Sequence, residues 1–90
     1  MAKAIITIKI MPETADADLS KIETEAKKII KGLGGDVGKV ERVPIAFGLS
    51  SLNIIFIADE KLGTEEFEQR LAKLENIQTA QIIDFRRAIG

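Results

Sequence analysis

Residues 4–11, with the sequence Ala-Ile-Ile-Thr-Ile-Lys-Ile-Met, form the stretch that decides the fold of this chain. Apolar side chains recur at every second position, which is the pattern of a β-strand that turns one face to a core. Pro12 ends this strand because proline has no backbone N–H to donate to a neighbouring strand. The face expected to be buried carries Ala4, Ile6, Ile8 and Ile10.

A helical pattern follows this strand. Asp16 and Asp18 are candidate N-caps, and the glycines at positions 32, 34 and 35 are expected to end the helix. Lysines at positions 27, 28 and 31 lie near its end, where cations complement the helix dipole. The apolar stripe of this helix is expected to consist of Leu19, Ile22, Ala26, Ile29 and Ile30.

The second half of the chain predicts two strands, a helix and a final strand. The strands are predicted over residues 37–43, 52–58 and 79–87. Thr64 is expected to cap a helix that carries Phe67, Leu71 and Leu74 on one face and ends near Asn76. Strict alternation predicts two sets of side chains that share a face: Val37, Lys39, Glu41 and Val43 in the second strand, and Gln81, Ile83, Phe85 and Arg87 in the fourth.

The resulting order is β-α-β-β-α-β, which is the split β-α-β or ferredoxin-like arrangement. We therefore expect an α+β fold: a two-layer α/β sandwich with a four-stranded antiparallel sheet and two helices on one face. No linker or low-complexity segment interrupts the pattern, so residues 1–90 are expected to form a single domain. This topology does not name a function, because unrelated activities share it.

The composition limits the classes of function. With 46% hydrophobic and 30% charged residues, the 90-residue chain is typical of a soluble globular domain. Its net charge of −1 gives no general attraction to nucleic acid or to an anionic membrane. Cysteine and histidine are absent, so thiolate chemistry and the usual proton carrier near neutral pH are missing, and an enzyme is not expected. No apolar run is long enough to span a bilayer and no signal peptide is evident, so a cytoplasmic location is expected.

The loop between the second and third strands reads Pro44-Ile45-Ala46-Phe47-Gly48-Leu49. Phe47 stands between two small residues, so its ring is free to project from the loop. A loop aromatic buries little within its own fold and is suited to a partner surface. The sequence leaves a second interpretation open, in which the loop folds back and Phe47 closes the end of the core.

Other conspicuous motifs have structural explanations. The segment Gly32–Gly35 follows a helix, whereas a phosphate-binding loop follows a strand and precedes a helix. Asp16 and Asp18 lack the glycine and the distant glutamate of a calcium loop, so no metal site is predicted. Asp59 and Glu60 are interpreted as turn residues, with a partner contact as the alternative.

Two features of the sheet bear on binding. The face opposite the helices is expected to carry Ile5, Ile55, Ile57 and Ile83, covered by the chain's own loops, by its C-terminal tail or by another molecule. Aromatic rings that could stack on RNA bases are missing from the first and third strands on that face, so nucleic-acid binding is not expected. Arg86 and Arg87 end the last strand. Two interpretations are open: one arginine binds a carboxylate or phosphate of a partner, or both side chains are solvated.

Four segments together resemble the elongation factor 1-beta family of archaeal and eukaryotic guanine-nucleotide exchange factors. They are the loop at 44–49, the strand start Leu52-Asn53-Ile54, the turn Ala58-Asp59-Glu60-Lys61 that leads to Gly63-Thr64, and the closing Asp84-Phe85-Arg86-Arg87. The resemblance covers residues 3–90, and the loop together with the acidic turn at this spacing is its most specific part.

The resemblance implies a protein that speeds release of GDP from the GTPase elongation factor 1-alpha, without covalent chemistry and without a cofactor. It implies that Phe47 inserts into the GDP-bound GTPase near its switch and Mg²⁺ region. The eukaryotic relatives carry a lysine near the C-terminus that disturbs the Mg²⁺ site, and Gly90 stands at that position here. With Arg86 or Arg87 as the candidate substitute for that lysine, the expected partner-binding residues are Pro44, Ile45, Ala46, Phe47, Gly48, Leu49, Arg86 and Arg87.

Two other function classes share this topology. A regulatory domain of the ACT type would bind a small ligand, such as an amino acid, in a cleft at a dimer interface. An acylphosphatase would need an anion-binding loop with an arginine after the first strand, and residues 12–18 contain no arginine. The sequence does not predict an oligomeric state.

Overall fold

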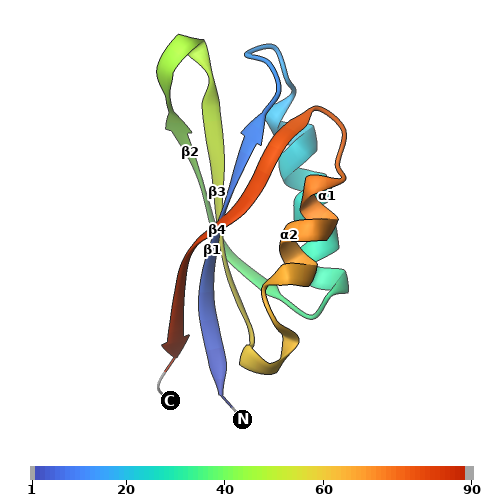
Figure 1. Ribbon diagram of the computed structural model, residues 1–90, viewed down its shortest axis with the longest axis vertical. Coiled ribbons are helices and arrows are strands. Elements are labelled where there is room, and N and C mark those ends of the chain that lie inside the picture. Colours follow the sequence, from blue (N-terminus) through green and yellow to red (C-terminus); the bar gives the residue numbers. More distant parts are fainter. Residues whose placement is uncertain (1, 89–90) are drawn as a thin grey trace.

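The computed structural model describes residues 2–88 and confirms the predicted order of elements (Figure 1). Two single-turn 3-10 helices, η1 (Ala46–Gly48) and η2 (Glu60–Leu62), lie in the connections on either side of the third strand. The six main elements are β1 (Lys3–Pro12), α1 (Leu19–Gly32), β2 (Asp36–Pro44), β3 (Ser50–Asp59), α2 (Glu65–Ala72) and β4 (Ile77–Ala88).

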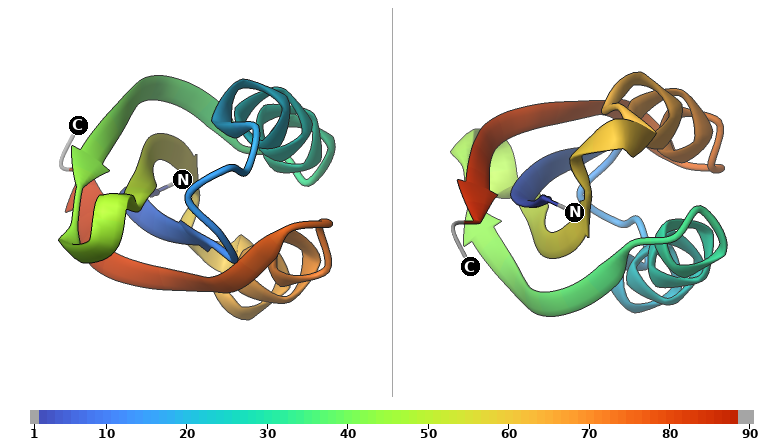
Figure 2. Two further views of the ribbon diagram at one scale, coloured as in Figure 1. Left: turned by 90° about the horizontal axis from the view of Figure 1, so that it is seen from above. Right: turned by 90° about the horizontal axis from the view of Figure 1, so that it is seen from below.

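The four strands form one antiparallel sheet in the order β2-β3-β1-β4. Both helices lie against the same face of this sheet, and the views along the long axis show α1 and α2 side by side (Figure 2). This is the ferredoxin-like α+β fold that the sequence predicted. The turn between β2 and β3 lies at one end of the long axis, and the ends of β1 and β4 that are nearest the chain termini lie at the other (Figure 1).

The core lies between the sheet and the helices. Phe56 of β3 and Phe67 of α2 are both buried, and their ring centroids are 4.8 Å apart in a tilted arrangement. Aromatic pairs of this geometry add to the stabilisation that burial of their area provides. The other buried apolar residues are Ala4, Ile6, Ile8, Ile10, Ile22, Ala26, Ile30, Leu52, Ile54, Ala58, Leu71 and Ile77.

The helix ends agree with the sequence only in part. The Asp18 carboxylate accepts a hydrogen bond from the backbone N–H of Lys21 at 3.2 Å, which confirms it as the N-cap of α1. Thr64 precedes α2 but makes no side-chain cap bond, because its own backbone is already helical. The prediction that this helix continues to Asn76 was wrong. It ends at Ala72, and Leu74 packs on the core from the turn that follows.

Strict alternation was wrong in both edge strands, because the pairing register shifts once in β2 and twice in β4. In β2 the register shifts between Val37 and Lys39, so Gly38 is an extra residue and Val37 faces Phe56 on the helix-covered face. In β4 a shift opposite Thr7 and Ile8 makes Ile83 an extra residue, and a second shift opposite Met11 and Pro12 makes Gln78 an extra residue. The helix-covered face of β4 therefore carries Ile77, Ala80, Ile82, Phe85 and Arg87, whereas Gln81 faces the other way.

The open face of the sheet keeps part of the expected apolar patch. Ile5 and Ile57 are neighbours across β1 and β3 and are both partly exposed, and Ile55 lies further along β3 in a half-buried position. Ile83 is half exposed at its bulge. Lys9 and Asn53 follow on the same face, so the patch is bordered by polar side chains.

Candidate functional site

The β2–β3 hairpin ends in a tight, hydrogen-bonded tip. The ladder runs through Val43 opposite Ser51 and Pro44 opposite Ser50. The N–H of Ile45 then donates to the carbonyl of Leu49 at 2.8 Å, and the N–H of Leu49 donates to the carbonyl of Ala46 at 3.3 Å. These two bonds fix the ends of the segment Ala46–Gly48, so Phe47 projects from a hydrogen-bonded turn.

The backbone of Phe47 is strained. Its φ of 64° and ψ of 30° lie in the left-handed region, and Gly48 follows with a φ of 75°. These values match a type I′ hairpin turn, in which asparagine, aspartate or glycine normally occupies the position of Phe47. A left-handed conformation costs a bulky residue about 1–2 kcal/mol, and such strain is concentrated at functional sites.

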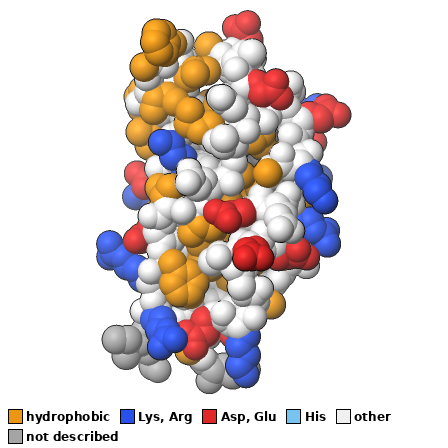
Figure 3. Space-filling view, in the orientation of Figure 1, with side chains coloured by type: hydrophobic (Ala, Val, Ile, Leu, Met, Phe, Trp, Pro, Cys, Tyr) orange, Lys and Arg blue, Asp and Glu red, His pale blue; other side chains and the backbone are white. Residues whose placement is uncertain are grey.

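The ring of Phe47 is exposed to solvent. Phe47 is 95% exposed, the largest exposure among the large hydrophobic residues that the structure describes. The interpretation in which this ring closes the end of the core is therefore wrong. Ile45 and Leu49 are half-buried at the base of the tip, and hydrophobic side chains gather at this end of the molecule (Figure 3). The loop thus presents one aromatic side chain on an apolar base.

The strain at the tip gives a direct prediction for stability. Phe47→Asn creates the Asn-Gly pair that type I′ turns favour, so we expect the free energy of unfolding to rise by about 0.5–1 kcal/mol. For a domain of this size the melting temperature should rise by a few degrees, which a thermal melt would measure. The matched control is Phe85→Asn in β4, which removes a partly buried ring from a strand and should lower the melting temperature. A lower melting temperature for Phe47→Asn would contradict the strain argument.

The two arginines lie at the other end of the sheet. Arg86 pairs with Ile5 and Arg87 with Ala4, so they leave β4 on opposite faces. Arg86 Nε lies 3.1 Å from Asp84 Oδ2, and Arg87 Nε lies 3.0 Å from Glu60 Oε2. Both arginine side chains remain about three-quarters exposed, at 75% and 74%. Gly90, the position of the eukaryotic lysine, lies outside the described residues.

The fold does not bring the loop and the arginines together. Ser50 is opposite Pro44 at the base of the tip, and Ile57 is opposite Ile5, the residue that pairs with Arg86. These two positions are seven residues apart in β3, which corresponds to about 23 Å at the usual rise of about 3.3 Å per residue. A single partner that contacts Phe47 and an arginine must therefore cover most of the length of the sheet (Figure 1).

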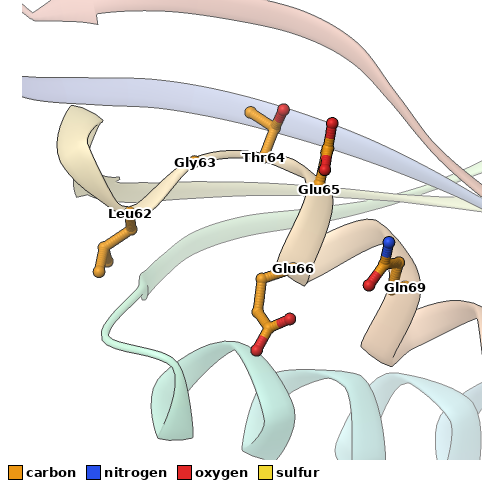
Figure 4. Close-up of a pocket in the computed structure, with 6 residues that line it drawn as sticks. All are labelled: Leu62, Gly63, Thr64, Glu65, Glu66 and Gln69. Carbon is orange, nitrogen blue, oxygen red and sulfur yellow. The ribbon is translucent and has the colours of Figure 1, made fainter.

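A shallow hollow beside the start of α2 is the main alternative site. It is lined by Leu62, Gly63, Thr64, Glu65, Glu66 and Gln69. Glu66 points toward α1, whereas Thr64 and Glu65 point away from it (Figure 4). Two carboxylates beside one apolar side chain repel phosphate groups and do not form a nucleotide site. Within residues 2–88 no three acidic side chains come close enough together to hold a metal ion.

The described part of the chain includes no helix with the length and apolar character that a bilayer-spanning segment requires.

Glu60 and Asp84, the carboxylates that hold the two arginines, were not identified as their partners from the sequence. Asp84 lies two residues before Arg86, where strand geometry predicts a common face. Glu60 is 27 residues before Arg87, and no local pattern links them.

Comparison with known proteins gives one consistent family. Residues 5–88 match the model of the EF-1 guanine nucleotide exchange domain. The chain is 39% identical to elongation factor 1-beta of Methanobrevibacter smithii over 88 residues, which are 97% of this chain and 98% of that protein. It is 36% identical to elongation factor 1-beta of Methanothermobacter thermautotrophicus, with the same coverage of each chain. It is 38% identical to that of Methanosarcina barkeri, covering 97% of this chain and 99% of the relative. The chain therefore belongs to the family of EF-1 guanine nucleotide exchange domains.

Proposed function

We propose that this protein promotes the exchange of GDP for GTP on translation elongation factor 1-alpha, and that Phe47 is the side chain that inserts into the GTPase. Family membership supports the exchange activity and the kind of partner. The observation that carries the role of Phe47 is a 95% exposed ring held in a left-handed conformation at the tip of a braced hairpin. The site of action is the cytoplasm, where translation takes place.

The mechanism follows from thermodynamic linkage. The exchange factor and GDP weaken each other's binding to the GTPase by the same factor, because coupling between two ligands is reciprocal. GDP is held through its phosphates, Mg²⁺ and the ordered switch segments. A ring inserted near the switch and Mg²⁺ region displaces these groups, and each 1.4 kcal/mol of lost binding increases release about tenfold when it appears in the off-rate.

The hairpin is suited to this role because its tip is already ordered. Aromatic side chains supply large contact area with few rotatable bonds, so they lose little entropy on binding. The two hydrogen bonds at the ends of Ala46–Gly48 fix the backbone before the partner arrives. Binding energy is therefore available to disturb the GTPase instead of ordering the loop. The process makes and breaks no covalent bond in the exchange factor.

The remaining residues of the proposed partner-binding surface lie in two places. Pro44, Ile45, Ala46, Gly48 and Leu49 form its base, which lies over one end of the sheet. Arg86 and Arg87 provide positive charge at the other end for a carboxylate or phosphate of the complex. The GTPase in its GDP-bound form is the proposed partner, and this surface makes no direct contact with nucleic acid.

One assay tests the function itself. Elongation factor 1-alpha loaded with a fluorescent GDP analogue is mixed with excess GTP and with a small molar fraction of the protein. We expect the loss of fluorescence to accelerate at catalytic amounts of the protein and to saturate as its concentration rises. Release that stays at the spontaneous rate over the whole concentration range would refute the proposed function. A thermal shift assay with amino acids would test the ACT-type alternative.

A further inference from the structure

The β-bulge in β4 determines which face of the sheet Arg87 occupies. Ile83 is an extra residue relative to β1, so every later residue of β4 changes face. The carboxylate of Glu68 on α2 accepts a hydrogen bond from the backbone N–H of Ile82 at 2.7 Å, immediately before the bulge. Because of the bulge, Arg87 lies opposite Ala4 and leaves the strand on the side of η2 and the helices.

Glu60 meets Arg87 on that side. Arg87 Nε lies 3.0 Å from Glu60 Oε2, and the Glu60 side chain is 28% exposed, compared with 74% for Arg87. Within the described residues, Glu60 Oε2 is shielded from solvent and makes no aligned hydrogen bond. A shielded carboxylate oxygen requires compensating charge, and the Arg87 guanidinium supplies it.

Glu60 lies in a turn that is fixed by hydrogen bonds. Its backbone N–H donates to the carbonyl of Ala2 at 3.2 Å. The Asp59 side chain accepts a hydrogen bond from the N–H of Lys61 at 3.0 Å, which caps η2. The carboxylate is therefore the fixed member of the pair, whereas arginine has a long side chain with many rotamers. The ion pair restricts the orientations of Arg87 more than those of Glu60.

We infer that Glu60 is a positioning residue, which holds the guanidinium of Arg87 toward an anionic group of the GDP-bound GTPase. The contact with Glu60 is made through Nε, and the largely exposed side chain leaves the outer edge of the guanidinium open to a second carboxylate or to a phosphate. This inference rests on the proposed function. It assigns to the acidic turn a role in exchange that does not require the turn to touch the partner.

A set of four variants tests the inference in the fluorescent GDP assay, with the concentration of the exchange factor varied. Glu60→Gln and Arg87→Ala should each raise the half-saturating concentration about threefold to tenfold, and the double variant should match Arg87→Ala because the two residues act as one unit. Glu65→Gln, the same substitution at an exposed position of α2, is the matched control and should behave like the wild type. The inference would be overturned if Glu60→Gln left the half-saturating concentration unchanged. It would also be overturned if the double variant raised that concentration by the product of the two single effects.

A charge swap separates positioning from simple stabilisation. Glu60→Lys combined with Arg87→Glu restores an ion pair, so the melting temperature should return toward that of the wild type. Exchange should stay impaired, because the outward charge is now negative. Recovery of exchange together with stability would show that the pair is only structural and would overturn the inference. In that case the wild type would still stimulate release, so the proposed function would stand independently.

Two binding measurements identify the anionic group. Affinity of the wild type and of Arg87→Ala is measured for the nucleotide-free GTPase and for its GDP complex. Weaker binding of the variant to both forms points to a carboxylate of the GTPase, and weaker binding to the GDP complex alone points to a nucleotide phosphate. Equal affinity of the variant and the wild type in both forms would overturn the inference.

Discussion

Phe47→Ala is expected to lower the rate of GDP release per molecule of exchange factor by about 30-fold to 700-fold, because a central aromatic anchor contributes about 2–4 kcal/mol. The substitution removes a ring that is 95% exposed, so the free energy of unfolding should stay close to that of the wild type. The loss should appear in the ratio of the maximal rate to the half-saturating concentration. The fluorescent GDP assay measures this ratio, and a thermal melt of the same sample measures stability.

The matched control for this experiment is Leu62→Ala. Leu62 is also an exposed apolar residue, at 44%, but it lies in η2, close to the opposite end of β3 from the tip. Its truncation should leave exchange within about twofold of the wild type, as expected for a residue outside the central contact. If Phe47→Ala retained full exchange activity while remaining folded, the insertion of the ring would be refuted, although the family assignment would be unaffected.

Gly35→Ala is expected to destabilise the fold by about 2–3 kcal/mol, the upper range for overpacking of a core site. Gly35 is buried just before β2. A Cβ atom there would lie 2.5 Å from Cγ2 of Ile30 and 3.1 Å from both the Ile30 carbonyl oxygen and a ring carbon of Phe56. Because Cγ2 is a branch close to the helix backbone, α1 would have to move. The melting temperature should fall by about 10–20 °C.

Gly32→Ala is the control for Gly35→Ala. A Cβ at Gly32 meets no atom within 4 Å, and the residue lies in the last turn of α1. Alanine is favoured over glycine in a helix by up to about 1 kcal/mol, so this variant should be as stable as the wild type or more stable. Equal melting temperatures for the two alanine variants would show that the junction of α1 and β2 tolerates movement.

The fold was predictable from the sequence because its signals are local and agree with one another. The alternation of Ile6, Ile8 and Ile10, the cap at Asp18 and the helical spacing of Phe67 and Leu71 each specify their own element. The antiparallel pairing of β2 with β3 then follows from the short connection between them. Strand faces were predicted wrongly only where a bulge intervenes. An extra residue such as Gly38 or Ile83 moves the following side chains to the other face of the sheet, and the pattern of apolar and polar residues does not reveal it.

For the candidate site, the sequence predicted the exposure of Phe47 but not the backbone geometry of its loop. The position of Phe47 between small residues indicated a projecting ring, and the structure confirms that it is exposed. Its left-handed backbone was not predicted, because a phenylalanine is unusual at that position of a type I′ turn. The pairing of Glu60 with Arg87 depends on the bulge and on the placement of η2, both of which are tertiary features.

The bulges have a second consequence, which concerns self-association. β2 and β4 are the two outermost strands, and the pairing register shifts once within β2 and twice within β4. A row of unpaired N–H and C=O groups at the rim of a sheet is a template on which another polypeptide can add, as in amyloid growth. Because both rims are kinked, a foreign strand finds no long, straight register on either side. Such irregular rims disfavour the cross-β addition of another strand.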